Sequence, residues 1–238
     1  MSELIFQSDS YLKEFDCAIV EIDAEENAVV LDRTAFYPGG GGQPCDKGDL
    51  VVEDEIYPVK KVKKKGAKIY HYIDGPLPKV NKSSKGKIDW EHRYKLMRTH
   101  TAMHILCGVV WRDYKAQVTG GNMEPLKGRM DFEFENFDKN LIQDIEEKVN
   151  KEVESKRNIK VKILKREEAF QIPDLIRTKI NLLPEGIKEV RTVEIEGLDL
   201  QADGGTHVKN TNEVGRIKIV DYKSKGKNNK RIYVELED

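Results

Sequence analysis

The spacing of apolar residues changes near residue 90, and this change limits the folds that the chain can adopt. Before that point, short segments rich in Val, Ile and Tyr alternate apolar with polar residues, at positions 17–23, 28–37, 49–63 and 68–75. Successive side chains of a strand point to opposite faces, so the alternation predicts strands that each bury one face. We therefore expect a β-barrel-like domain, a small barrel or curled sheet, in residues 1–90.

From Glu91 onward, apolar residues and histidines recur at spacings of three and four, which predicts a long helix with one broad buried face. The residues of that face are Leu96, Met97, His100, Met103, His104, Cys107, Val110 and Trp111. The lysine-rich segment that precedes the helix, residues 79–90, contains Gly and Ser and has the composition of a connection. The domain boundary is therefore expected between residues 90 and 91.

A second helix is expected after Asp138, which is a plausible N-cap. Its buried stripe would be Leu141, Ile142, Ile145, Val149 and Val153. Further strand patterns occur at 129–137, 156–165, 190–201, 216–224 and 231–236, and a short helix follows the second of them. The predicted fold class is α+β: a small N-terminal β-barrel domain, then an α+β domain in residues 91–238 with a sheet packed by long helices.

Composition predicts a soluble, cytoplasmic protein. Charged residues make up 35% of the 238 residues, and no apolar run approaches the roughly 20 residues that span a bilayer. The N-terminus lacks a basic region followed by an apolar stretch, so neither secretion nor a membrane is expected. Cys17, Cys45 and Cys107 are widely spaced and form no CxxC pair, which argues against a disulfide framework and a cysteine-rich zinc ribbon.

Charge is distributed unevenly along the chain. Residues 1–32 hold nine acids and one lysine, whereas residues 60–95 hold twelve Lys or Arg and three acids. A second basic run, residues 215–231, holds seven Lys or Arg and one acid. This pattern is typical of a protein that presents a positive face to a phosphate backbone. Solvated lysines that only aid solubility are the alternative explanation.

Two pairs of metal-ligand residues are spaced four residues apart. His100 and His104, in HTAMH, lie one helical turn apart, and Asp203 and His207 lie in DGGTH. Imidazole and carboxylate are ordinary zinc ligands, so the two pairs together indicate a divalent metal site. The helical pair alone is more often a packing or surface feature, and the absence of Glu after His100 excludes an HExxH protease. Cys107 lies about 10 Å from His100 along the helix axis, so we expect a buried structural thiol there.

The motifs HTAMH and DGGTH, together with the upstream RTAFYPGGGGQPCDKG, resemble those of the AlaX family, the freestanding alanyl-tRNA editing proteins. They also resemble the editing domain of alanyl-tRNA synthetase. The resemblance extends from about Leu31 to Val234 and is to the medium-length type. It implies a β-barrel joined to an α+β editing domain that hydrolyses seryl, and sometimes glycyl, esters of mischarged tRNA(Ala). The length leaves no room for an adenylate-forming domain, which agrees with ATP-independent editing in trans.

The resemblance implies one Zn²⁺ per chain. The family pattern is HxxxH followed by CxxxH, with four zinc ligands; His100, His104 and His207 match it, and Asp203 stands at the cysteine. Asp203 could ligate zinc through oxygen. Alternatively, three histidines could hold the ion with water in the fourth position while Asp203 orients a neighbour or acts as a base. The third alternative is a chain that has lost its metal.

The resemblance also assigns roles to the glycine-rich motif. It implies that Thr34 and the loop Gly39, Gly40, Gly41 and Gly42 help to recognise the seryl group, and Gln43 is the other polar side chain flanking the loop. The candidate catalytic residues are Thr34, Gln43, His100, His104 and His207. The loop could instead be only a turn between strands, and it lacks the Gly-Lys-Ser/Thr ending of a phosphate-binding loop. The predicted partner is the acceptor end of tRNA(Ala), with no obligate protein partner. Two other functions are weighed: a tRNA-binding module that has lost hydrolysis, and a metalloesterase for small molecules.

Overall fold

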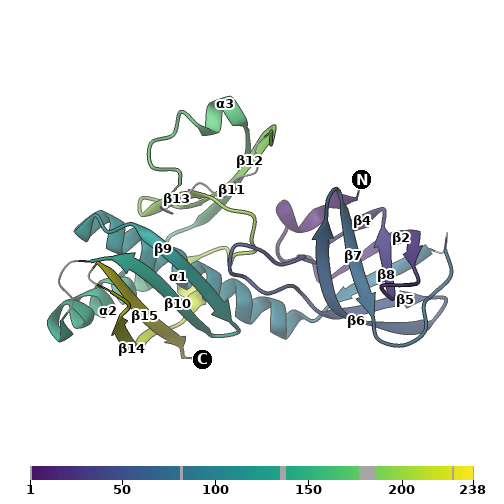
Figure 1. Ribbon diagram of the computed structural model, residues 1–238, viewed down its shortest axis with the longest axis horizontal. Helices are drawn as coiled ribbons and strands as arrows, with labels where there is room; N and C mark the ends of the chain where they lie inside the picture. The colour runs from purple at the N-terminus through teal and green to yellow at the C-terminus, as the bar shows by residue number, and fades with distance from the viewer. Residues whose placement is uncertain (1, 81–82, 135–137, 177–185, 227, 238) are drawn as a thin grey trace. The chain divides into compact units, whose positions relative to one another are not determined.

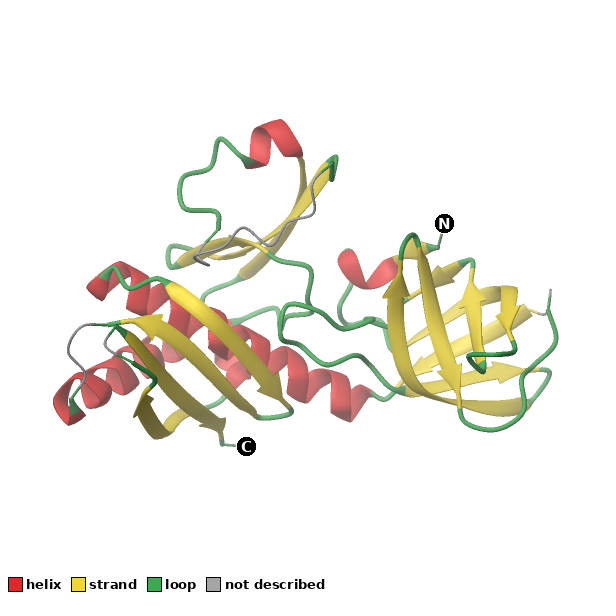
Figure 2. Cartoon of the chain, in the orientation of Figure 1, coloured by secondary structure: helices red, strands yellow, loops and turns green. Residues whose placement is uncertain are grey.

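The computed structural model describes residues 2–80, 83–134, 138–176, 186–226 and 228–237. The chain forms two compact units, Met1–Lys95 and Leu96–Asp238. Strands make up most of the first unit, and the two long helices among the described residues run largely or wholly through the second (Figure 2). None of the described helices combines the length and the apolar content needed to cross a membrane.

The first unit is a closed antiparallel barrel with strand order β2-β3-β7-β6-β5-β8 (Figure 1). Its strands are β2 (Glu14–Asp23), β3 (Ala28–Leu31), β5 (Gly48–Val52), β6 (Glu55–Lys65), β7 (Lys68–Ile73) and β8 (Ser83–Ile88). The short strands β1 (Glu3–Leu4) and β4 (Arg33–Thr34) pair in parallel, and the 3₁₀ helix η1 (Ile5–Gln7) follows β1. Alternate residues such as Phe15, Leu31, Leu50 and Ile69 fill the interior. The barrel predicted from the alternating pattern is confirmed.

One part of the sequence prediction for this unit is wrong, because residues 83–88 are a strand and not a connection. Strand β8 pairs with both β2 and β5 and so closes the barrel. Its lysines alternate outward while Ser84, Gly86 and Ile88 point inward. A Cβ on Gly86 would lie 2.3 Å from the Phe15 ring, so glycine makes room for a large core side chain here. Residues 81–82 of the same predicted connection lie outside the described residues.

The second unit contains an antiparallel sheet of order β14-β15-β10-β9 and a smaller sheet of order β11-β12-β13. Its strands are β9 (Val118–Glu124), β10 (Lys127–Glu133), β11 (Ile159–Lys165), β12 (Glu189–Ile195), β13 (Asp199–Ala202), β14 (Ile217–Ser224) and β15 (Asn229–Leu236). Its helices are α1 (Trp90–Tyr114), which begins in the first unit, α2 (Lys139–Glu154), α3 (Arg166–Ala169) and the 3₁₀ helix η2 (Thr211–Val214). Helices against a sheet confirm the predicted α+β class. The end of the predicted strand 129–137 lies outside the described residues.

Helix α1 is buried on all sides over residues 96–110, whereas the sequence predicted one buried face. On one side it contacts the larger sheet, because a Cβ on Gly128 of β10 would lie 2.6 Å from the sulfur of Met103. On another side Gly108 allows close approach of the turn between β12 and β13, where Leu198 and Asp199 would lie 2.9 and 3.1 Å from an added Cβ. Small residues therefore let two layers pack on the helix.

Helix α2 begins as the sequence predicted. The Asp138 side chain accepts a hydrogen bond from the backbone N–H of Leu141 at 2.8 Å, which satisfies one of the free N–H groups of the first turn. Ile142, Ile145, Val149 and Val153 form the buried stripe. Leu141 is only half-buried, so the stripe is one residue narrower than predicted.

A buried ion pair ties the glycine-rich motif to the start of α1. Arg93 donates to Asp46 through Nε at 2.8 Å and through Nη2, and Nη2 also reaches the carbonyl of Ala35 at 2.6 Å. The Asp46 carboxylate accepts in addition from the backbone N–H of Tyr37. Both side chains of the pair are fully buried. The segment 35–46, which contains the four glycines, is therefore held against the first turn of the helix.

We expect Arg93→Leu to lower the free energy of unfolding by about 3–5 kcal/mol, because it leaves the Asp46 carboxylate buried without its cation. The double variant Arg93→Leu/Asp46→Leu should be less destabilised than the single variant. Urea unfolding of both proteins measures this difference. A single variant no less stable than the double variant would contradict the role given to the ion pair.

Candidate metal centre

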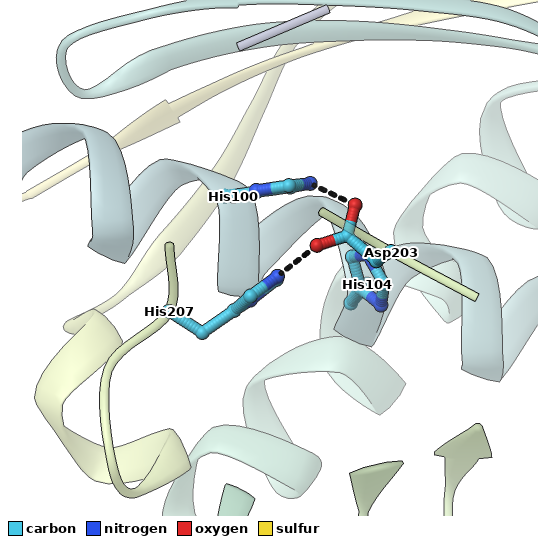
Figure 3. Close-up of side chains that lie close together, drawn as sticks. All are labelled: His100, His104, Asp203 and His207. Atoms are coloured by element: carbon cyan, nitrogen blue, oxygen red, sulfur yellow. Dashed lines mark hydrogen bonds and ion pairs between the residues drawn. The ribbon is translucent and has the colours of Figure 1, made fainter. Parts of the chain in front are cut away.

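Four side chains from two distant segments converge in the second unit. His100 and His104 come from α1, and Asp203 and His207 come from the loop that follows β13. One ligand atom from each residue can be chosen so that all four lie within 4.8 Å of one another. The two pairs that the sequence singled out are thus brought together (Figure 3).

The helix and the loop position these side chains in different ways. The four-residue spacing on α1 places the rings of His100 and His104 with centroids 5.1 Å apart, as expected for one helical turn. The loop is held to β12, since Asp203 N–H donates to the carbonyl of Arg191 at 3.1 Å. It then turns so that the His207 ring stacks on His100 at 4.2 Å.

The Asp203 carboxylate lies between two of the histidines, as Figure 3 shows. Its Oδ1 is 3.5 Å from His100 Nε2, and its Oδ2 is 3.0 Å from His207 Nε2. The backbone N–H of Gly205 also donates to Oδ2, at 2.7 Å. Arg191 lies behind the loop, with Nη1 2.9 Å from the Asp203 carbonyl and 3.7 Å from Oδ2. Contacts with side chains and with the backbone therefore fix the orientation of the Asp203 carboxylate.

Two polar residues that the sequence analysis missed contact the outer ring nitrogens of the histidines. Asp199 Oδ2 lies 3.1 Å from His104 Nδ1 and also accepts from Gln201 at 2.7 Å. Thr101 Oγ1 lies 3.1 Å from His207 Nδ1. These contacts engage Nδ1 of both rings, and Nε2 of His207 faces Asp203 within the cluster. Histidines that bind metals are commonly held by such a partner on the second nitrogen.

Burial and neighbouring charges set the ionisation of the cluster. Burial lowers the pKa of His207 to about 4 and that of His100 well below 6.5, although Asp203 favours the protonated form of both. Burial also acts on His104, but the hydrogen bond and charge of Asp199 outweigh it and raise that pKa. Burial alone would raise the pKa of Asp203, yet His100 and the His207 hydrogen bond hold it well below 3.8.

The donor set fits a divalent ion of the zinc type. Ligand atoms about 2.0–2.2 Å from a tetrahedral ion lie roughly 3.4 Å from one another. The distances of 3.0 and 3.5 Å from Asp203 to His207 and His100 are close to that spacing. Three imidazoles and one carboxylate are ligands of intermediate hardness that suit zinc. The four residues are therefore compatible with a metal site. Cys107 is buried outside the cluster.

The other candidate residues from the sequence, Thr34, Gln43 and the four glycines, lie in the first unit. The glycines have φ values of +82°, +133°, +58° and +87°, a backbone region that residues with a Cβ rarely adopt. Gly40 and Gln43 exchange two backbone hydrogen bonds, of 3.1 and 2.9 Å. The Tyr37 hydroxyl donates to the Gly40 carbonyl at 3.0 Å. The motif is thus a tight, hydrogen-bonded turn.

Thr34 is fully buried beside a histidine inside the barrel. His71 Nδ1 lies 3.3 Å from the Val29 carbonyl, which can only accept, so Nδ1 carries the ring proton. Burial lowers the pKa of His71 to about 4, and the neutral ring therefore accepts through Nε2. The Thr34 hydroxyl, 2.8 Å away, donates to it and accepts from the Phe36 N–H at 3.1 Å.

Two family models match separate segments of the chain. A model described as the threonyl and alanyl tRNA synthetase second additional domain matches residues 190–233. That segment contains Asp203 and His207 of the cluster. A model described as tRNA synthetases class II (A) matches residues 10–92, which cover the barrel.

Comparison with curated proteins covers the whole chain. It is 44% identical over 243 residues to the alanyl-tRNA editing protein AlaX-M of Saccharolobus solfataricus, and the match covers 100% of both chains. The chain belongs to the AlaX-M family of alanyl-tRNA editing proteins. AlaX-M of Methanosarcina barkeri is 40% identical, again over 100% of both chains. The alanine–tRNA ligase of Ignicoccus hospitalis is 40% identical over 91% of this chain and 24% of its own length. The resemblance inferred from the motifs is confirmed.

We expect Asp199→Asn to weaken the binding of a divalent ion at the cluster, because it removes the charge that orients His104. Loss of such a partner costs roughly 10–100-fold in metal affinity. Competition with a chelating dye for Zn²⁺ measures the dissociation constant. Asp221→Asn, at an exposed carboxylate of β14, is the matched control and should bind like the wild type. An unchanged dissociation constant for Asp199→Asn would show that Asp199 does not support the site.

Proposed function

We propose that this protein hydrolyses the aminoacyl ester of mischarged seryl-tRNA(Ala) in trans, with zinc held by His100, His104, Asp203 and His207. The observation that carries the proposal is the convergence of these four residues in a chain that matches AlaX-M proteins over its full length. Editing proteins act on aminoacyl-tRNA, so the partner would be the acceptor end of tRNA(Ala). Glycyl-tRNA(Ala) is a further substrate to be tested.

The reaction makes modest chemical demands on the protein. An aminoacyl ester is already activated, so positioning a water and stabilising the developing oxyanion suffice. A bound zinc ion would supply a Lewis acid that lowers the pKa of water and polarises a carbonyl. In this proposal Asp199 and Thr101 hold the rings of His104 and His207, and the Asp203 carboxylate balances charge within the cluster. Water adds across the ester, and the products are free serine and deacylated tRNA(Ala) with the hydroxyl of its 3′-terminal ribose restored.

Selectivity requires recognition of one hydroxyl group, because the seryl and alanyl esters differ only there. A site that hydrogen-bonds a substrate hydroxyl can reject an analogue lacking it by roughly 10⁴–10⁵. The proposed reader is Thr34, with the Gly39–Gly42 turn beside it. Its hydroxyl is buried against His71 in the barrel, so contact with a substrate requires these surroundings to open.

The first test compares the deacylation of seryl-, glycyl- and alanyl-tRNA(Ala), with and without a chelator. We expect rapid loss of serine, slow loss of alanine, and an activity that chelation removes and added Zn²⁺ restores. His104→Ala should abolish hydrolysis while tRNA binding persists. Absence of hydrolysis by the metal-loaded wild type, with tRNA still bound, would favour the alternative of a binding module without catalysis.

Thr34→Val tests the proposed reader. Losing one hydrogen bond to the seryl hydroxyl should remove about 1–3 kcal/mol of transition-state stabilisation. The value of kcat/KM for seryl-tRNA should therefore fall roughly 5–150-fold. Thr34→Ser retains the hydroxyl and should keep most of the activity. Unfolding midpoints of both variants are measured in parallel, because valine also leaves His71 without its partner. An equal loss of tRNA binding and hydrolysis in Thr34→Val would contradict a role in reading the hydroxyl.

A further inference from the structure

The outer face of the β6–β7 hairpin carries a row of lysines beside two tyrosines. Lys61 pairs with Tyr72 and Lys63 with Tyr70 in the strand register, and Lys65 pairs with Lys68. Between them, Val62 and His71 point inward and are fully buried. Because side chains alternate along a strand, these lysines and tyrosines share the outer face. We call Lys61, Lys63, Lys65, Lys68, Tyr70 and Tyr72 the lysine ladder.

The ladder carries more positive charge than its neighbours neutralise. Lys65 pairs with Glu26 at 2.9 Å and Lys68 with Glu21 at 2.6 Å. Within the described residues, neither Lys61 nor Lys63 has a carboxylate at ion-pair distance. Like charges close together on one face of a sheet are destabilising. The ladder is therefore a surface that an approaching polyanion would stabilise.

The two tyrosines add flat surfaces to this charge. Lys65 Nζ lies 5.2 Å from the centre of the Tyr70 ring and 5.8 Å from that of Tyr72, and Lys61 Nζ lies 5.7 Å from Tyr72. Both rings are half-buried, with part of their surface left open. A surface on which aromatic rings alternate with cations is suited to binding nucleic acid. The rings can contact bases and riboses, while the lysines contact phosphates.

Among the described residues of the second basic run, residues 215–231, three cations have partners within the fold. Arg231 makes a two-point hydrogen bond to Asp131 at 2.6 and 2.7 Å, and Lys223 pairs with Asp221 at 2.8 Å. Lys230 is buried and donates to the Gly226 carbonyl at 2.8 Å. Residue 227 lies outside the described residues. Lys223 and Arg231 of the second run are thus paired with acids, whereas strands β6 and β7 align lysines of the first run on one face.

We propose that the lysine ladder binds the phosphodiester backbone of the tRNA substrate. The proposal rests on the proposed function, because it takes aminoacyl-tRNA as the substrate. The ladder supplies sequence-independent affinity, and recognition of the amino acid is left to other residues. Lys61 and Lys63 contribute most, since neither would have to break an ion pair with a described carboxylate.

The double variant Lys61→Gln/Lys63→Gln tests the ladder in the full-length protein. Binding of uncharged tRNA(Ala) is followed by fluorescence anisotropy across a salt series. Each lost phosphate contact reduces the slope of log K against log salt by about 0.9, so we expect a slope smaller by roughly 2. The affinity at 0.1 M salt should fall roughly 10–100-fold. The rate of seryl-tRNA hydrolysis at saturating protein should stay within about twofold of the wild type.

Lys85→Gln/Lys87→Gln is the matched control, because it makes the same charge change on β8, where both lysines lie within 4 Å of Glu14. It should change tRNA affinity less than threefold, by roughly the small effect of exposed ion pairs. Equal losses of tRNA affinity in the two double variants would mean that only net charge matters, and would overturn the proposal that the lysine ladder binds tRNA. Unchanged binding by the ladder variant would overturn it as well. A wild type that binds tRNA without hydrolysing seryl-tRNA would overturn the proposed function instead, and the salt slopes would still decide the ladder.

Discussion

Burial of helix α1 on all sides is the constraint on which the candidate site depends. An imidazole placed on this helix is removed from water, so its polar atoms require partners inside the protein. His104 has Asp199, and Asp203 lies beside His100. Leu198 and Asp199 approach the helix closely at Gly108, where a side chain would prevent the contact. Packing around one helix thus brings the loop after β13 to the histidines.

The charge of the Asp203 carboxylate in the cluster is balanced by its immediate neighbours. One carboxylate lies among three imidazoles, and Arg191 contacts that carboxylate from behind. Burial favours neutral forms of His100 and His207, the forms that bind divalent ions through a ring nitrogen. The arrangement therefore leaves neutral imidazole nitrogens and one carboxylate close together, as a divalent ion would require. Asp203 provides an oxygen where the family pattern inferred from the motifs has a thiolate.

Sequence analysis located the cluster because its four residues fall in two pairs with four-residue spacing, and His100 and His104 needed only helical periodicity to be placed together. It missed Asp199 and Thr101, whose contacts depend on how α1 packs against β13 and the loop that follows it. It also mistook β8 for a connection. The lysines of that strand gave it the composition of a loop, while its inward positions hold Ser, Gly and Ile. The segment becomes a strand because it pairs with β2 and β5, and both of these strands are distant from it in sequence.

The sequence by itself determined the α+β class, the change from strands to helix near residue 90, the candidate ligand residues and the family, because periodicity and motif spacing are local properties. The tertiary structure alone decided that the two pairs of candidate ligands meet, that Thr34 contacts His71 inside the barrel, and that lysines of one basic run share one face of the β6–β7 hairpin. These outcomes depend on contacts between residues that are far apart in the chain. No local pattern records such contacts, since they arise only when strands and helices pack.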